Sequence, residues 1–270
     1  MGQPERHPGK FVSGTINWVI LDRENDFSRV ILSLDLGNKS YQEILQPDYG
    51  LDEPLHNFSL GVCLTRNYKV VVVSFYQLYM SIYFCIYEVR VHTLGTNCWR
   101  RIRDFPYRMS EIEGYPGKFV SGTINWVIFS QDSSRVILSL DLCNESYQEI
   151  SQPDYGLDER LCYLNVGVSN ECLCVLAHTK TFLDIWLMKD YGNKESWTKL
   201  FTVPFAKFRN YFNFANLLYI YEEEDQVLLE IHHKSYVYNY KNGTLKILEI
   251  QGRPSTFFNS YVYVESLISP

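Results

Sequence analysis

The chain has 270 residues and a formal net charge of −6, with a sequence pI of about 5.6. This acidic balance argues against a nucleic-acid-binding surface, which needs clustered lysine and arginine. Aromatic residues make up 16% of the chain, including 21 tyrosines and 16 phenylalanines, and such rings favour strands over helices. Composition therefore predicts an all-β globular protein.

The polar residues 1–8 lack the apolar run of a signal peptide. The most apolar stretch, residues 74–91, is interrupted by Gln77, Glu88 and Arg90. We therefore expect it to form two strands of a sheet and not a membrane span. The seven cysteines are odd in number and irregularly spaced, which predicts free thiols in a reducing compartment, the cytoplasm or the nucleus.

An internal duplication divides the chain. Residues 8–20 are identical to residues 116–128, and residues 28–53 closely match residues 134–159. The three differences are Gly37/Cys143, Lys39/Glu145 and Leu45/Ser151. A fold repeat preserves a pattern and not a sequence, so this identity indicates a recent gene duplication or a gene-model artefact; the alternative is two identical surfaces for two identical partners. We predict a blade-like segment over residues 1–53, a near-copy of 116–159, followed by one domain over residues 54–270.

A weaker repeat recurs along the chain: an alternating strand, a polar turn, then an aromatic residue or leucine with an aliphatic residue three positions later. Its anchors are Tyr41, Trp99, Tyr147, Trp197 and Leu245, and the last three intervals are 48–50 residues. Asn242-Gly243 is the strongest turn signal. Earlier strands of these units are expected at residues 70–75, 119–128, 161–168, 172–177, 217–221 and 226–231, with an insertion at 76–87 and an inter-blade loop at 205–215.

This period is typical of a kelch-like β-propeller, here with about five blade-like units of roughly 48–50 residues in a closed ring or an open arc. The recurring aromatic residues then fill the wedges between blades. On this interpretation the five tryptophans are packing residues and not recognition residues; they are Trp18, Trp99, Trp126, Trp186 and Trp197.

The sequence assigns no catalytic, cofactor-binding or metal-binding residue. None of the six histidines has a partner at ligand spacing; they are His7, His56, His92, His178, His232 and His233. Cys172 and Cys174 lack the second pair that zinc needs. The acidic run at residues 222–225 is interpreted as a solvated hairpin turn, the alternative being contact with a basic target.

Several motifs resemble those of the F-box-associated domain of plant F-box proteins. They lie at residues 68–73, 91–102, 117–126, 136–142, 184–192, 195–200 and 264–267, so the resemblance covers residues 56–270. It implies a kelch-like propeller without catalytic activity that binds a target protein as the substrate-recognition part of a Skp–cullin–F-box ubiquitin ligase. The family's N-terminal F-box docks on the Skp adaptor, but residues 1–60 do not resemble an F-box, so adaptor docking is not expected.

The expected partner is therefore a protein of unspecified identity, with no cofactor, nucleic acid or membrane involved. Two alternatives remain open. One is a degenerate or truncated product without specific binding, and the other is a propeller enzyme that acts on carbohydrate, which needs paired carboxylates.

Overall fold

The computed structural model describes fourteen parts of the chain. They are residues 10–12, 15–22, 28–35, 40–44, 55–62, 68–77, 85–93, 96, 98–106, 117–129, 134–156, 161–204, 215–231 and 234–248. Side chains are described from residue 69 onward, residues 74–87 excepted. The chain divides into two compact units, one of Met1–Gly50 with Ile250–Pro270 and the other of Leu51–Glu249.

In the first unit, one antiparallel sheet is described, with strands in chain order. Its strands are β1 (Lys10–Val12), β2 (Thr15–Asp22), β3 (Ser28–Asp35) and β4 (Ser40–Ile44).

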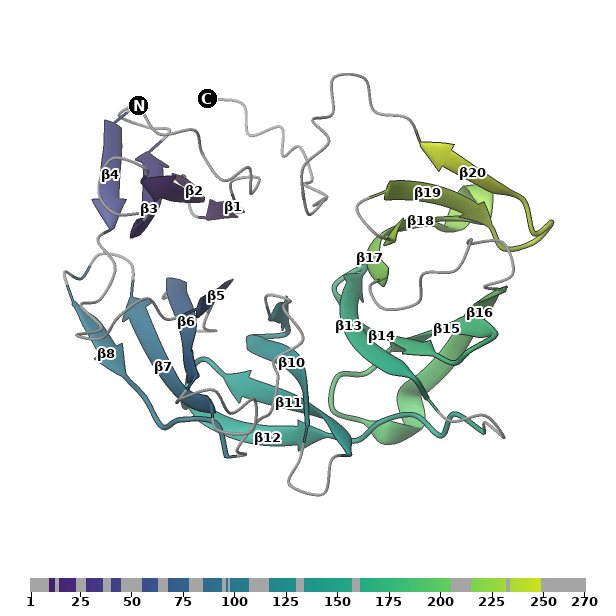
Figure 1. The fold of residues 1–270 in the computed structure, drawn as a ribbon, viewed down its shortest axis with the longest axis horizontal. Coiled ribbons are helices and arrows are strands. Elements are labelled where there is room, and N and C mark those ends of the chain that lie inside the picture. Colours follow the sequence, from purple (N-terminus) through teal and green to yellow (C-terminus); the bar gives the residue numbers. More distant parts are fainter. Residues whose placement is uncertain are drawn as a thin grey trace. The chain divides into compact units, whose positions relative to one another are not determined.

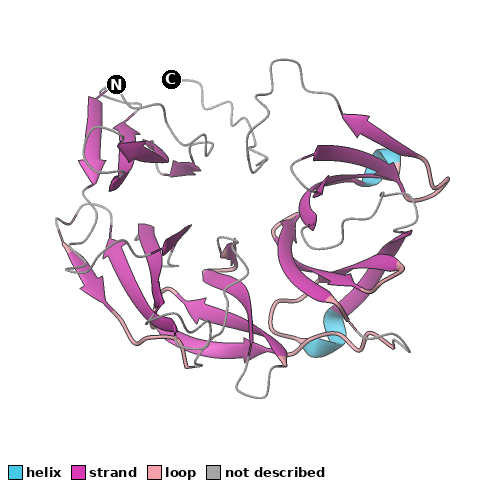
Figure 2. Ribbon diagram, in the orientation of Figure 1, coloured by secondary structure: helices cyan, strands magenta, loops and turns pink. Residues whose placement is uncertain are grey.

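In the second unit, the described residues form four further sheets of the same kind, and each is a meander of four consecutive strands (Figure 1). The first two comprise β5 (Leu55–Val62), β6 (Tyr68–Gln77), β7 (Cys85–Thr93) and β8 (Trp99–Arg101), then β9 (Lys118–Val120), β10 (Thr123–Phe129), β11 (Arg135–Asp141) and β12 (Ser146–Ile150). The next two comprise β13 (Tyr163–Ser169), β14 (Cys172–His178), β15 (Phe182–Met188) and β16 (Trp197–Pro204), then β17 (Ala215–Tyr221), β18 (Gln226–Ile231), β19 (Lys234–Asn239) and β20 (Leu245–Leu248). Strands dominate the described residues, and the helical turns η1 (Lys194–Ser196) and η3 (Glu222–Glu224) are short (Figure 2).

Tight turns make these meanders possible. The β9–β10 hairpin turns at Ser121 and Gly122, which have φ values of 48° and 80°. The β13–β14 hairpin turns at Asn170 and Glu171, with φ values of 47° and 62°. Two successive positive φ angles match the right-handed twist of the flanking strands, which makes this geometry the favoured two-residue hairpin.

The cores of the second unit lie between successive sheets. Alternation along β14 sends Leu173 and Val175 into a cluster with sheet β9–β12, and Cys174 and Leu176 into a cluster with sheet β17–β20. A third cluster joins sheets β5–β8 and β9–β12 around the buried Trp126. Both faces of the inner sheets are therefore buried, which explains why their strands are nearly continuous apolar runs. First strands of neighbouring sheets also contact one another, as β13 contacts β17; this is the blade arrangement of a β-propeller.

Most of the expected elements are confirmed. Each anchor lies at the first or second position of the fourth strand of its sheet, as Trp197 does in β16. Trp126 is buried in the cluster between sheets β5–β8 and β9–β12. Trp186 and Trp197 are partly buried and pack against the cluster between sheets β9–β12 and β13–β16. The interval 119–128 holds two strands, β9 and β10, separated by the turn at Gly122. The side chain of Trp18 and residues 205–214 of the loop expected at 205–215 lie outside the described residues, whereas Ala215 begins β17 and is not part of a loop.

The insertion expected at 76–87 is only partly covered by the described residues, which lie in strands. Residues 76 and 77 end β6, and residues 85–87 begin β7, with Tyr76 paired to Ile86. These residues lengthen a hairpin, because both segments continue the alternating apolar pattern of their strands; residues 78–84 lie outside the described part of the chain.

Candidate protein-interaction site

The turns of the second unit provide the surface on which a site could form. In an antiparallel meander, the turn between strands one and two and the turn between strands three and four lie at the same edge of the sheet. We call this the turn edge. A hydrogen bond joins two turns of neighbouring sheets at this edge. Asn170 Nδ2, in the β13–β14 turn, donates to Glu222 Oε1, in the β17–β18 turn, at 3.0 Å.

Two tyrosines on β17 are exposed near this edge. A β-bulge interrupts the pairing of β17 between Leu217 and Tyr219. Because of this extra residue, both Leu217 and Ile220 are buried in the core, although they are three positions apart. Tyr219 and Tyr221 therefore remain on the outside, with 37% and 42% of their surface exposed.

The two rings contact each other in an edge-to-face arrangement, with centroids 4.6 Å apart. Three exposed glutamates, Glu222–Glu224, follow directly in η3, and Asp225 completes the turn with φ of 54°. Asp225 Oδ2 pairs with Lys241 Nζ at 2.8 Å. We call Tyr219, Tyr221 and residues 222–225 the tyrosine corner. The prediction of an exposed hairpin turn at 222–225 is confirmed, whereas the exposed tyrosine pair was missed because a bulge leaves no sequence signal.

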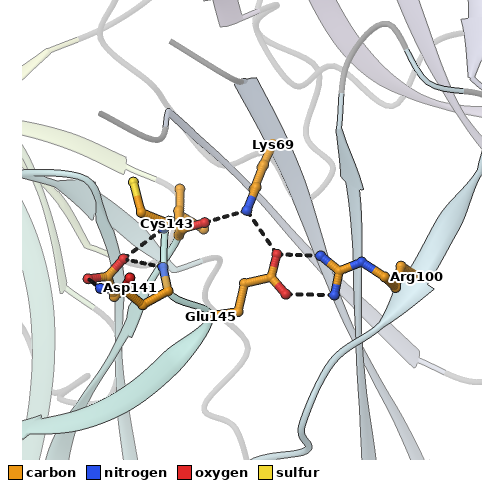
Figure 3. Close-up of polar contacts among 7 residues, drawn as sticks. Lys69, Arg100, Asp141, Cys143 and Glu145 are labelled. Carbon is orange, nitrogen blue, oxygen red and sulfur yellow. Dashed lines mark hydrogen bonds and ion pairs between the residues drawn. The ribbon is translucent and has the colours of Figure 1, made fainter. Parts of the chain in front are cut away.

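A second feature of the turn edge is an ion cluster between sheets β5–β8 and β9–β12 (Figure 3). Glu145 lies in the β11–β12 turn with φ of 53°. Its carboxylate accepts two hydrogen bonds from the Arg100 guanidinium, at 2.6 and 2.5 Å, and one from Lys69 Nζ at 2.8 Å. Lys69 Nζ also donates to Leu142 O at 2.5 Å.

The pKa of Glu145 lies below its usual range, first because of the hydrogen bonds from Arg100 and further because of Lys69, while burial opposes them. A carboxylate held ionised in this way is a structural anion and not a general acid. Within the same turn, Asp141 Oδ1 accepts hydrogen bonds from the backbone amides of Cys143 and Asn144, at 2.7 and 3.0 Å. The cluster therefore ties a turn of one sheet to the strands of the preceding sheet.

Sheets β9–β12 and β13–β16 are joined by a buried hydroxyl contact. Tyr191, from the turn between β15 and η1, donates to Asn125 Oδ1 at 2.7 Å. Thr123 Oγ1 donates to the same phenol oxygen at 2.7 Å, and Ser139 Oγ lies 2.7 Å from it. Thr123, Asn125 and Ser139 are all buried. We call these three residues the hydroxyl socket.

Three side chains of types that often act in catalysis, those of His92, His178 and Cys174, are buried. Burial lowers the pKa of His178 to about 3, with the Arg135 charge adding to the effect, and burial likewise lowers the pKa of His92. Burial also raises the pKa of the Cys174 thiol. In the part of the chain that the structure describes, no group of three His, Cys, Asp or Glu side chains could hold a metal ion. The side chains of His7, His56, His232 and His233 lie outside that part.

Two further findings concern the cysteines and membrane spans. Cys143 is disulfide-bonded, so the expectation that all thiols are free is wrong at this position, whereas Cys98, Cys162, Cys172 and Cys174 are free. Cysteine spacing carries no information on which side chains meet through the fold. Among the described residues, no helix is long and apolar enough to cross a membrane.

Comparison with known proteins gives related proteins and similar folds. F-box protein CPR1 of Arabidopsis thaliana is 27% identical over 198 residues, which cover 67% of this chain and 48% of that protein. An F-box/kelch-repeat protein of Arabidopsis thaliana is 24% identical over 241 residues, covering 88% of this chain and 60% of its own length. The chain thus spans about half the length of the curated relatives that it matches.

Among solved structures, the oligogalacturonate lyase of Vibrio parahaemolyticus aligns with a TM-score of 0.54 at 13% identity, covering 96% of this chain and 69% of the lyase. At this identity the likeness concerns the fold alone. The model of the F-box associated β-propeller domain matches residues 55–270. The chain therefore belongs to the F-box associated β-propeller family.

Proposed function

We propose that this chain is a non-catalytic protein-recognition module, which binds a target protein through the tyrosine corner. The proposal rests on one observation: Tyr219 and Tyr221 are exposed and pack against each other. Tyrosine is enriched at protein interfaces, because its ring offers apolar area and its hydroxyl a polar group at low entropic cost. The adjacent exposed glutamates favour a partner with basic side chains next to an apolar contact.

We further propose that the target is recognised on behalf of a Skp–cullin–F-box ubiquitin ligase in the cytoplasm or nucleus. The support is the family and the relatives named F-box proteins. Since the family match begins at residue 55 and residues 1–50 hold a copied sheet, we propose that this chain does not itself dock on the Skp adaptor. The buried histidines and the ion-paired Glu145 do not favour the alternative of a carbohydrate-acting enzyme.

The test compares three forms of the chain as bait in a plant lysate, quantified by mass spectrometry. The double variant Tyr219→Ser/Tyr221→Ser should lose a defined set of proteins that the wild type retains. Ile247→Ser is the matched control, because Ile247 is 59% exposed on β20, away from this corner, and should retain the set. Equal capture by all three forms would refute the role of the tyrosine corner. Purified Skp adaptor should not bind the wild type, and tight direct binding would contradict the second proposal.

A further inference from the structure

The tyrosine corner combines two features that attract a cationic side chain. The rings of Tyr219 and Tyr221 lie at 64° to each other, and 37% and 42% of the two residues' surface is exposed. The face of a tyrosine ring attracts a cation placed within about 6 Å of its centroid. The exposed glutamates 222–224 follow the second ring directly in the chain. A cation that binds over these rings therefore finds negative charge beside them.

Contacts within the chain already use part of this negative charge. Lys241 Nζ pairs with Asp225 Oδ2 at 2.8 Å, which neutralises the last acidic residue of the run. Asn170 Nδ2 donates to Glu222 Oε1 at 3.0 Å and ties the first glutamate to the neighbouring sheet. Residues 223–224, between these two anchored positions, are exposed. Their carboxylates can therefore accept hydrogen bonds from a partner without breaking either contact.

Arginine can stack on a ring and donate hydrogen bonds at the same time, and this fold contains examples of both contacts. The Arg135 Cζ lies 5.0 Å from the centroid of the Phe129 ring, while Arg135 Nη2 donates to Cys162 O at 2.7 Å. The Arg100 guanidinium donates two hydrogen bonds to the Glu145 carboxylate. A planar guanidinium therefore suits a site that offers both a ring face and carboxylates.

The fold holds a lysine over aromatic rings in a different way. Lys199 Nζ lies 5.8 Å from the ring centroid of Phe182 and 5.9 Å from that of Trp186. It also pairs at 2.7 Å with Asp184 Oδ2, and this carboxylate is completely buried, so that water screens the pair little. The glutamates 222–224 are exposed instead, and a surface ion pair contributes little. A strongly hydrated ammonium group would therefore gain less at the tyrosine corner than a guanidinium group.

We propose that the tyrosine corner binds an arginine of the target protein, with the guanidinium plane stacked on a tyrosine ring and its N–H groups donating to the carboxylates of Glu223 and Glu224. The inference rests on the proposed function, in which a target binds at this corner, and it names the side chain that the target contributes. Stacking uses the face of the guanidinium and hydrogen bonding uses its edge, so both contacts can form together.

The probes are three tetrapeptides, Gly-X-Leu-Gly with acetylated and amidated ends, in which X is arginine, lysine or citrulline. Citrulline has the planar shape of arginine without its charge. Each peptide is titrated at constant ionic strength into the full-length chain labelled with carbon-13 in its tyrosine rings, and NMR follows the signals of Tyr219 and Tyr221, which the variants Tyr219→Phe and Tyr221→Phe assign. The arginine peptide should shift both signals to saturation. The lysine peptide should bind about threefold or more weakly, and the citrulline peptide about tenfold or more weakly.

Two double variants with the same change in net charge test the carboxylates. Glu223→Gln/Glu224→Gln should weaken binding of the arginine peptide about fivefold. Glu149→Gln/Glu195→Gln changes exposed glutamates in β12 and η1 and should leave this binding unchanged. The inference is overturned if the arginine peptide causes no saturable shift, if the lysine or the citrulline peptide binds as tightly, or if both double variants bind the arginine peptide equally.

This test is separate from that of the proposed function, because it uses free peptides and no lysate. If Tyr219→Ser/Tyr221→Ser loses the lysate partners but the arginine peptide does not bind the wild type, the proposed function is supported and the arginine inference is overturned. If the arginine peptide binds as expected while all forms capture the same lysate proteins, the corner binds guanidinium groups and the proposed function fails.

Discussion

At the scale of single residues, one of the three differences between the copies changes the sign of a charge at a contact between sheets. Glu145 sits between Lys69 and Arg100, and position 39 of the first copy holds lysine. The Lys69 and Glu145 side chains are only 11% and 17% exposed, so their interaction is screened less than that of a surface pair. A lysine at position 145 would place three cations together.

Glu145→Lys is therefore expected to lower the free energy of unfolding by about 2–4 kcal/mol, because it leaves a partly buried charge without its partner. Urea denaturation followed by circular dichroism measures this loss. Glu149→Lys is the control, since Glu149 lies exposed on β12, the strand that follows the turn of Glu145, and the variant makes the same charge change; it should cost less than about 0.5 kcal/mol. Equal losses in the two variants would show that the cluster does not stabilise the fold.

His178 predicts a pH dependence of stability. Its pKa is about 3 in the folded chain, lowered first by burial, against 6.5 for an ordinary histidine. Between these values the unfolded chain binds a proton that the folded chain does not, so the contribution is complete above pH 6.5 and is lost as the pH falls toward 3. From pH 7 to pH 5 this histidine should account for about 2 kcal/mol of lost stability.

The measurement is urea denaturation at both pH values for the wild type and for His178→Gln, which does not titrate. The difference in stability between pH 7 and pH 5 should be smaller in the variant by about 2 kcal/mol, whatever its absolute stability. Identical pH differences in the two proteins would mean that the pKa of His178 is the same in the folded and the unfolded chain.

At the scale of elements, the strand β9 depends on a glycine directly before it. A Cβ at Gly117 would meet Ile124 Cγ2 and lie 2.5 Å from the Trp126 indole, both in strand β10. Gly117→Ala must therefore displace a core tryptophan, and we expect a loss of about 1–3 kcal/mol in unfolding free energy. Gly156→Ala is a useful comparison, because no atom lies within 4 Å of its Cβ and only its φ of 55° opposes the change. A loss at Gly117 no greater than that at Gly156 would contradict the packing argument.

The elements that sequence could predict are those specified locally. The turn at Asn242-Gly243 and the strands β17 and β18 follow from turn residues and alternation, which act within about 15 residues. The anchor Trp197 follows from the repeat of 48–50 residues. The socket and the ion cluster could not be predicted, because Tyr191 lies 66 residues from Asn125 and Glu145 lies 76 residues from Lys69. The exposure of Tyr219 depends on the β-bulge between Leu217 and Tyr219. Strict alternation from the buried Leu217 would instead predict that Tyr219 is buried.

At the scale of the whole molecule, the question is what the copied segment contributes. We propose that residues 1–53 form a separate blade-like segment and that residues 54–270 form the family domain. The support is that the described cores join the sheets of the second unit to one another and that the family match begins at residue 55. The two compact units divide the chain differently at its end, because residues 250–270 group with residues 1–50.

A chain that starts at residue 54 should therefore unfold cooperatively, within about 5 °C of the full-length midpoint. Differential scanning calorimetry measures both the midpoint and the cooperativity. Aggregation or loss of a cooperative transition would show that the copied segment is needed for folding.

The links between sheets share a direction that matters for synthesis on the ribosome. Glu145 accepts a hydrogen bond from Lys69 of the preceding sheet, and Tyr191 donates one to Asn125 of the preceding sheet. Asn165 of β13 donates to Ala215 O and Asn216 Oδ1 of β17, at 3.0 and 3.1 Å. In these three cases, the earlier sheet acquires polar partners from the sheet that is translated next. A nascent chain that ends after sheet β5–β8, β9–β12 or β13–β16 therefore carries buried polar groups of that sheet without these partners, and a premature stop codon leaves the chain in that state. Quality control of truncated translation products would act on that sheet.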